Sequence, residues 1–461
     1  MISHAVLTAM LPEHLLLLGI VLLLCLEIAG RWQRASLAVA LVCVGAAALA
    51  AARLSLDGYA AAPFAGHFSV DPAGLMAKAM VLALALPVLL MSRDEFAGGE
   101  FPVLLLSSLY GVCLMQSADS MPTLFLGLEI MSLPVYVLVL LAYRRPQSAE
   151  AALKYLVLGG TATATFLMGA SLLYGASGTM SVASFAQALV SADALPRTAA
   201  VLVVLAFFLK AAIVPFHAWA PDAYEGASVP VTAYMATIVK AAVLLAAVRL
   251  FGTAKLGSPM IELLAVLPLA SIVWGNLAAM RQPSLRRMIA YSSIAHAGYL
   301  FYALLGDPAG RLQAVAFYLL AYGLLNLLAF AALPAAADDF QRDRLDNMKG
   351  LFHRSPFAAL MIGIAMLSLA GIPPFPGFVA KFLIFKNVMA AGYTTYAVLG
   401  LVGSYLGIYF YLRVIQFMFM SADAPVADEG KTRGFAFAAS LACLSAMALI
   451  SVFPGWVIGG F

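Results

Sequence analysis

The stretch Phe207-Phe208-Leu209-Lys210-Ala211-Ala212-Ile213-Val214-Pro215-Phe216-His217-Ala218-Trp219 lies inside a long apolar segment, residues 197–220. Within eight residues it holds Lys210, the helix-breaking Pro215 and His217. In a membrane such a lysine is costly, because a charge at the centre of a bilayer costs about 2.5–3.5 kcal/mol on insertion scales. Lipid tolerates a broken helix only where protein or a water-filled cavity satisfies the freed backbone groups. A lysine beside such a break therefore predicts a functional site.

The composition indicates an integral membrane protein. Of the 461 residues, 64% are hydrophobic and 10% are charged, whereas a soluble domain carries about 25% charged residues. The net charge of +4 does not indicate nucleic-acid binding, because the Lys and Arg residues lie in short loops between apolar runs. The cysteines are far apart and form no C-x-x-C motif, so the chain predicts neither an iron–sulfur cluster nor a zinc site.

Segments of about 20 mostly apolar residues predict transmembrane helices. This criterion predicts an all-α polytopic fold with about fourteen spans, of which the first is a retained helix rather than a signal peptide. The predicted spans are 11–29, 35–53, 71–92, 100–118, 121–142, 150–174, 197–220, 227–250, 259–280, 285–305, 311–333, 356–388, 395–420 and 434–457.

The span 356–388 is too long for one straight crossing and contains a second break, Gly371-Ile372-Pro373-Pro374-Phe375-Pro376-Gly377. Aligning Val214-Pro215-Phe216 with Pro373-Pro374-Phe375 gives an offset of 159 residues. This offset places spans four to eight over spans nine to thirteen. Each unit has five spans, an odd number, so the second copy must be inverted. Paired broken helices are typical of the ion path of a transporter.

These patterns divide a single membrane domain, residues 1–461, into four parts. They are three N-terminal helices (1–99), a first five-helix repeat (100–250), a second five-helix repeat (258–420) and a C-terminal helix (434–457).

The loops predict the orientation, because cytoplasmic loops carry an excess of Lys and Arg. Loops after odd-numbered spans hold fourteen basic residues: Arg31, Arg34, Arg93, Arg144, Arg145, Arg281, Arg286, Arg287, Arg342, Arg344, Lys349, Arg354, Lys431 and Arg433. The other side holds only Arg53, Arg197, Arg249, Lys255 and Arg311. We therefore expect both termini on the periplasmic side.

Ionisable residues deep in the predicted spans are the candidate site. They are Glu129, Lys154, Lys210, Lys240, His296 and Lys381. A lysine that relays protons must release its proton near neutral pH, and moving a carboxylate such as Glu129 closer or farther would switch Lys210 between holding and releasing it. A histidine titrates near neutral pH and suits a link between two lysine sites.

Each of these residues also has a structural alternative. Glu129 could form a purely structural ion pair, and Lys154 lies near enough to its helix end to extend toward the interface. Haem ligation by His296 is disfavoured, because a pair of histidines is usual and only His217 is comparable. His217 itself either caps the broken helix or faces a cytoplasmic half-channel. The acidic turn Pro221–Gly226 is either a solvated loop or a structural clamp.

Several motifs together resemble the antiporter-like subunits of respiratory complex I. They are Pro215-Phe216-His217-Ala218-Trp219-Ala220-Pro221-Asp222-Ala223-Tyr224-Glu225-Gly226-Ala227, Gly127-Leu128-Glu129, Ala152-Leu153-Lys154-Tyr155, and Gly371-Ile372-Pro373-Pro374 followed by Gly377-Phe378-Val379-Ala380-Lys381-Phe382. The likeness covers about residues 70–420 and is closest to the N type among the L, M and N subunits of bacterial NADH:quinone oxidoreductase. Ser228 departs from the proline that the family often has there.

The resemblance implies a proton-translocating subunit of the bacterial inner membrane that performs no redox chemistry itself. It implies that Glu129, Lys210, Lys240 and Lys381 form the proton path, with Lys154 near the first pair and His296 between the halves. FMN, iron–sulfur clusters and quinone would belong to partner subunits, and the neighbours would be another antiporter-like subunit and small membrane subunits.

Three other functions fit the same residues at this stage. A subunit of a Mrp-type sodium/proton antiporter or of a membrane-bound hydrogenase would share the motifs. A structural membrane scaffold would need no proton path, and an independent solute transporter would act alone. The lysine-rich path favours protons over sodium, which prefers carboxylate and carbonyl ligands.

Overall fold

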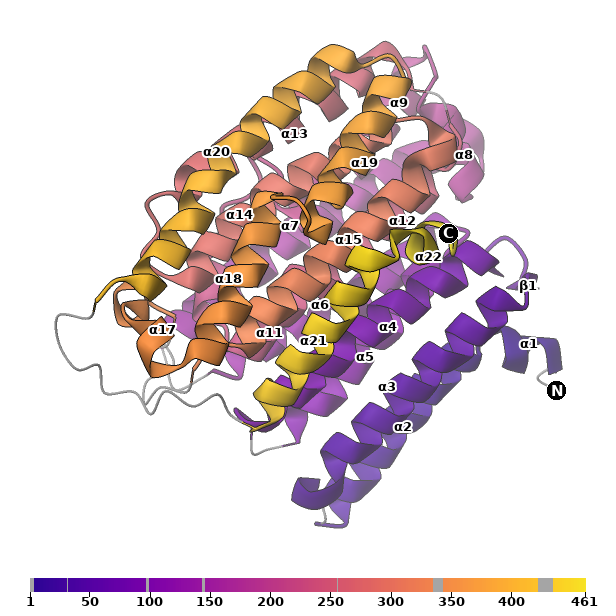
Figure 1. Cartoon of the computed structure of the whole chain (residues 1–461). Helices are drawn as coiled ribbons and strands as arrows, with labels where there is room; N and C mark the ends of the chain where they lie inside the picture. The colour runs from indigo at the N-terminus through magenta and orange to yellow at the C-terminus, as the bar shows by residue number, and fades with distance from the viewer. Residues whose placement is uncertain are drawn as a thin grey trace.

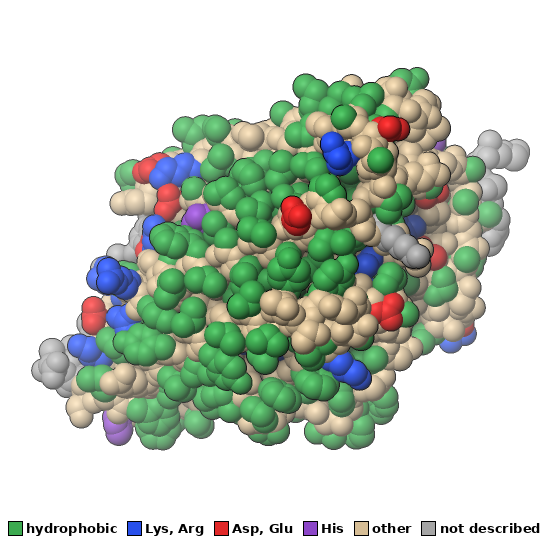
Figure 2. Space-filling model, turned by 90° about the horizontal axis from the view of Figure 1, so that it is seen from above, with side chains coloured by type: hydrophobic (Ala, Val, Ile, Leu, Met, Phe, Trp, Pro, Cys, Tyr) green, Lys and Arg blue, Asp and Glu red, His purple; other side chains and the backbone are tan. Residues whose placement is uncertain are grey.

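A bundle of long helices makes up almost the whole molecule in the computed structural model, which describes residues 4–30, 32–96, 99–142, 146–254, 256–334, 343–421 and 434–461 (Figure 1). The side chains of residues 4 and 32–34 are not described. A two-stranded antiparallel hairpin, β1 (Ala61–Phe64) and β2 (Phe68–Val70), joins two of the helices. Hydrophobic side chains cover much of the face seen in Figure 2, and most Lys and Arg side chains lie toward its ends. This surface is typical of a protein embedded in lipid.

The N-terminal unit packs against one side of the bundle (Figure 1). Its helices are α1 (His4–Ala9), α2 (Leu11–Ile28), α3 (Trp32–Leu56) and α4 (Pro72–Arg93). The start of α4 is fixed by Asp71, whose side chain accepts a hydrogen bond of 2.7 Å from the Gly74 amide, and by a proline at the first helical position.

Two longer sets of helices follow. The first comprises α5 (Glu100–Gln116), α6 (Met121–Leu140), α7 (Pro146–Ser177), α8 (Val182–Ala188), α9 (Ala194–Ala211), α10 (Trp219–Gly226), α11 (Val229–Tyr234), the π-helical η1 (Met235–Val239) and α12 (Lys240–Phe251). The second comprises α13 (Ser258–Ala279), α14 (Leu285–Tyr302), η2 (Ala303–Leu305), α15 (Pro308–Ala331), η3 (Leu345–Met348), α17 (Leu351–Arg354), α18 (Pro356–Ala370), α19 (Pro376–Ala390) and α20 (Thr394–Phe419). The chain ends with α21 (Gly434–Val452) and α22 (Pro454–Ile458).

The predicted all-α membrane fold is confirmed, but the count of fourteen spans is not. Twelve helices among the described residues are long and apolar enough to cross a membrane. Two predicted spans contain shorter apolar helices, namely α5 and α18. In the second case the reason is the predicted break, which divides the span 356–388 into α18 and α19.

The same local structure recurs at both breaks. Ala212 directly follows helix α9 and Gly371 directly follows helix α18, and each of these residues adopts the left-handed conformation, with φ of 60° and 86°. They are 159 residues apart, the offset predicted from the proline motifs. A second correspondence lies at Ser120 and Ser284, which cap α6 and α14 and pair with Ser181 and Arg344 in isolated β-bridges. The two sets of helices are therefore repeats of one unit.

The second repeat runs in the opposite direction to the first. The Val182 amide donates to Asp119 O (3.1 Å) at the end of α5, and the Gly257 amide donates to Leu189 O (3.1 Å) at the start of α13. Val182 and Leu189, which make these two bonds, stand at the two ends of the short helix α8, so both bonds lie on the same face of the bundle. Helix α13 therefore begins on the face where α5 ends, which confirms the predicted inversion.

The opposite face holds many of the basic residues used to predict orientation. Arg286 at the start of α14 donates to Ala227 O (2.7 Å) after α10, and Ser148 at the start of α7 donates to Gly226 O (2.6 Å). Other residues of that prediction lie outside the described residues or have no described side chain: Arg31, Arg34, Arg144, Arg145, Lys255, Arg342, Lys431 and Arg433.

A fully buried ion pair anchors this face of the second repeat. The Arg286 guanidinium donates through Nη2 to Asp343 Oδ1 (3.0 Å) and through Nε to Asp343 Oδ2 (3.1 Å). We expect Asp343→Ala to lower the free energy of unfolding by about 3–5 kcal/mol, because it leaves a buried charge without its partner. Thermal unfolding of the purified protein in detergent measures this loss.

The matched control for that substitution is Asp346→Ala. Asp346 lies in the next turn, is largely exposed, and is 3.8 Å from Lys349. Its removal should change stability by at most about 0.5 kcal/mol. Equal effects of the two substitutions would contradict the anchoring role of Asp343.

Candidate functional site

The first break positions Lys210 in the last turn of α9. Backbone groups freed by the break find protein partners: the Trp219 indole donates to Leu209 O (3.0 Å), and the Val214 amide donates to Ser271 Oγ (2.8 Å). The break is thus satisfied by side chains of α10 and α13, as a membrane interior requires. Lys210 itself is left free to make other contacts.

Among the described residues, helix α6 supplies the hydrogen-bond partners of the Lys210 ammonium. Its Nζ lies 3.3 Å from Glu129 Oε1, 3.1 Å from Ser132 Oγ and 3.4 Å from Tyr136 Oη. Positions i, i+3 and i+7 share one face of a helix, which is why these three side chains converge. Glu129 Oε1 also accepts a 2.5 Å hydrogen bond from Thr163 of α7. The structure therefore brings Glu129 and Lys210 together as an ion pair.

Lys240 lies at the centre of the bundle. It begins α12 directly after the π-helical turn η1, an irregularity that is frequent at functional sites. Its Nζ donates to Ser293 O (2.5 Å) and to Ser293 Oγ on α14. No ion pair of Lys240 is present within the described ranges. Lys240 thus faces an uncharged hydroxyl and a carbonyl.

His296 lies three residues after Ser293 on α14 and is held by two tyrosines. Nδ1 is 2.8 Å from Tyr318 Oη of α15, and Nε2 is 3.1 Å from Tyr411 Oη of α20. Tyr411 Oη also lies 2.5 Å from Ser292 Oγ. A neutral imidazole carries one donor and one acceptor nitrogen, and both hydroxyls can fill either role. The ring can therefore take a proton at one nitrogen and release one at the other.

Lys381 occupies the second break. Its Nζ donates to Ala370 O (3.0 Å), a carbonyl that the end of α18 leaves free, and lies 5.5 Å from the centroid of the Tyr299 ring. That ring is 5.5 Å from the His296 ring. Lys240, His296 and Lys381 therefore follow one another through side chains of α14. Lys210 and Lys240 have no hydrogen-bond partner in common among the described residues, and no direct hydrogen bond joins the two lysines.

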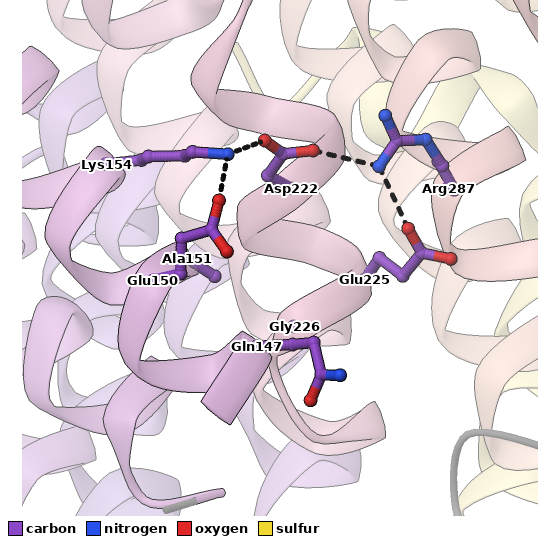
Figure 3. Close-up of a pocket in the computed structure, with 8 residues that line it drawn as sticks. All are labelled: Gln147, Glu150, Ala151, Lys154, Asp222, Glu225, Gly226 and Arg287. Atoms are coloured by element: carbon purple, nitrogen blue, oxygen red, sulfur yellow. Dashed lines mark hydrogen bonds and ion pairs between the residues drawn. The ribbon is translucent and has the colours of Figure 1, made fainter. Parts of the chain in front are cut away.

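Lys154 belongs to a different cluster from Lys210. Its Nζ lies 2.6 Å from both Glu150 Oε1 and Asp222 Oδ2 (Figure 3). Arg287 continues the row, with Nη1 2.9 Å from both Asp222 Oδ1 and Glu225 Oε2. These side chains line an open cavity of about 330 Å³. Residues Pro221–Gly226, predicted as a turn, lie within helix α10, and their carboxylates form a clamp that joins α10 to α7 and α14.

His217 lies away from the lysines. Its Nε2 accepts a 2.9 Å hydrogen bond from Trp274 Nε1 of α13. Within the described ranges no hydrogen bond links His217 to Lys210. No group of three or more His, Cys, Asp or Glu side chains that could hold a metal ion occurs in the part of the chain that the structure describes.

Sequence reasoning assigned no role to one further buried pair. Lys78 Nζ of α4 lies 2.6 Å from Glu13 Oε1 of α2, and both side chains are completely buried. This pair joins α2 to α4 within the N-terminal unit. The hydroxyl partners of the site, on Ser132, Tyr136 and Thr163, were also missed, although the first two stand at helical spacing from Glu129.

The sequence matches a known family of membrane proteins, and relatives in that family align with most of the chain. Residues 118–407 match the model of the family described as NADH:quinone oxidoreductase/Mrp antiporter, TM. The NADH-quinone oxidoreductase subunit N of Pelobacter propionicus is 37% identical over 458 residues, which covers 98% of each chain. The subunit N of Deinococcus radiodurans is 36% identical over 409 residues, or 86% of this chain and 83% of that one.

Solved structures share the fold along nearly the whole chain. A chain of respiratory complex I from Thermus thermophilus has a TM-score of 0.84 at 35% identity, covering 97% of this chain and 98% of that one. A chain of the Mrp complex from Dietzia has a TM-score of 0.81 at 22% identity, covering 98% and 96%. The second likeness shows the fold alone.

The indole that satisfies the first break should be needed for stability. We expect Trp219→Phe to lower the free energy of unfolding by about 0.5–1.5 kcal/mol, because Leu209 O loses the indole donor and keeps only the 3.3 Å hydrogen bond from the Ala212 amide. Thermal unfolding in detergent measures the change. Trp456→Phe is the control, since Trp456 is 67% exposed, and an equal loss in both variants would sink the explanation.

Proposed function

Because the chain belongs to the family of NADH-quinone oxidoreductase subunit N, we propose that it is the proton-translocating membrane subunit of a bacterial NADH:quinone oxidoreductase, respiratory complex I. The observation that carries this proposal is the row of buried ionisable side chains on both inverted repeats. The row contains Glu129, Lys210, Lys240, His296 and Lys381. Side chains of this kind are expensive inside a membrane and mark proton relays.

Each end of the row is attached to a broken helix. Lys210 immediately precedes the first break, and Lys381 follows the second. Glu129 stabilises the charged form of Lys210, so an increase in their separation would favour release of a proton toward the centre of the bundle. Lys240 and His296 would then receive and pass it, and Lys381 would hold it at the far end.

This chain would move protons without carrying electrons. We expect FMN, iron–sulfur clusters and quinone in partner subunits, where quinone reduction drives the change at Lys210. The neighbours in the membrane would be another antiporter-like subunit and small membrane subunits. The lysines favour protons over sodium, because sodium prefers oxygen ligands.

The location that fits this function is the bacterial inner membrane. The face that holds Arg286, Arg287 and Lys154 would be cytoplasmic, which places both termini on the periplasmic side. The open cavity beside Lys154 would then face the cytoplasm. Protons for the first repeat would enter there.

Replacement of either terminal lysine tests the proposal. We expect Lys210→Ala and Lys381→Ala to reduce proton pumping several-fold in the assembled complex, because each removes a proton-binding site from the row. The measurement is acidification of proteoliposomes during NADH oxidation, normalised to the rate of quinone reduction. Assembly is checked by the yield and subunit content of the purified complex.

Lys386→Ala is the matched control, because Lys386 lies on the same helix as Lys381 but is exposed. The Lys386→Ala complex should pump as many protons per quinone reduced as the wild-type complex. Wild-type pumping by the Lys210→Ala complex would instead indicate a structural scaffold.

A further inference from the structure

Helix α7 leads from the charged cavity to the ion pair of Lys210. Glu150 and Lys154 line the cavity, and Thr163 donates to Glu129. The nine residues from Lys154 to Thr163 rise by about 13 Å along the helix. Between these two levels, the side of α7 that faces α6 presents Tyr155 and Gly159.

Tyr136 of α6 fills the space between these levels. Its ring meets Tyr155 edge to face with centroids 4.6 Å apart, and Tyr155 stacks on Trp219 at 4.4 Å. Its hydroxyl lies 3.4 Å from Lys210 Nζ. Tyr136 is thus buried between the cavity and the ammonium and touches Lys210 directly.

Gly159 makes room for this hydroxyl. A Cβ at Gly159 would lie 2.0 Å from Tyr136 Oη and 2.8 Å from Cζ. Glycine inside a helix costs about 0.5–1 kcal/mol relative to alanine, and Gly159 lies in the interior of α7. The close approach of the Tyr136 hydroxyl gives a physical reason for a glycine at this position.

The three partners of Lys210 differ in what they can donate. The Glu129 carboxylate only accepts hydrogen bonds. Ser132 already donates its hydrogen to Leu128 O (2.6 Å), so toward Lys210 it is an acceptor. The Tyr136 hydroxyl lies next to the Ser132 hydroxyl and within 3.4 Å of Lys210 Nζ. Its hydrogen can point to Ser132 while Lys210 is an ammonium and can turn to a neutral Lys210 amine.

We propose that Tyr136 is the positioning residue of Lys210 during the deprotonated stage of the cycle. Its hydroxyl accepts from the ammonium and donates to the neutral amine, so Nζ keeps a partner on the side of the cytoplasmic cavity after the proton has left. The amine is thereby held where the next proton arrives. This inference rests on the proposed function, because it assigns a step to the same lysine.

Removal of the hydroxyl alone tests the inference in the complete complex. In Tyr136→Phe we expect the proton-to-electron ratio to fall at least twofold in proteoliposomes. We also expect the pH of half-maximal pumping to move by about one unit, because the two protonation states of Lys210 lose different hydrogen bonds. Tyr302→Phe is the control, since the Tyr302 hydroxyl is buried without a hydrogen-bond partner in the described structure.

A Tyr136→Phe complex with the wild-type ratio and an unchanged pH profile would overturn the inference. Gly159→Ala is the second variant, because it keeps the hydroxyl but displaces it, and it should also lower the ratio. If the Tyr136→Phe complex does not assemble, the Gly159→Ala complex provides the test. A wild-type proton-to-electron ratio in that complex overturns the inference. Failure of both variants to assemble would make Tyr136 a folding residue and would also overturn it.

Lys210→Ala in the same assay separates this inference from the proposed function. Loss of pumping in Lys210→Ala, with normal pumping in Tyr136→Phe, overturns only the role of Tyr136. Normal pumping in Lys210→Ala overturns both.

Discussion

A helix that breaks inside a bilayer must find partners within the protein for the backbone groups that it frees. This constraint explains much of the architecture, because both breaks lie where helices of other parts of the chain surround them. The first is satisfied by Trp219 and Ser271, which come from α10 and α13. Since α13 belongs to the second repeat, packing of the two repeats contributes to the stability of the first break.

The second break is satisfied by an ionisable side chain. Lys381 donates to Ala370 O, so the group that would hold a proton also caps the end of α18. The position that corresponds to Lys381 in the first repeat, 159 residues earlier, is Asp222, which lies in the charged row beside Arg287. The two repeats thus have the same backbone conformation at the break but carry their charged side chains at different positions. The proposed proton path would therefore have two different ends.

The sequence predicted the breaks, their offset and the lysines, because a proline or a charge in an apolar span is rare and costly. It could not predict the hydroxyl partners, since serine, threonine and tyrosine occur throughout such spans and only packing shows which of them meet. Tyr411 is 115 residues from His296 in the chain. The choice between a solvated loop and a clamp for residues Pro221–Gly226 depended on the tertiary contact between Lys154 and Asp222, which the sequence could not show.

The buried ion pairs of this protein fall into two physical kinds. Lys78–Glu13 and Arg286–Asp343 are short and almost completely excluded from solvent, and the second is held through two parallel bonds. Breaking such a pair leaves an uncompensated charge, so these pairs fix helices in place.

The pair of Lys210 and Glu129 differs from these two pairs in length and in exposure. Its 3.3 Å separation is longer, the Glu129 side chain is 20% exposed, and each partner has other hydrogen bonds, to Thr163 on one side and to Ser132 and Tyr136 on the other. Because this pair is longer and Glu129 is partly exposed, its separation costs less than that of the two pairs that are excluded from solvent. A proton path needs one pair that can open while the rest of the bundle stays closed, and the contacts around Lys210 meet that requirement.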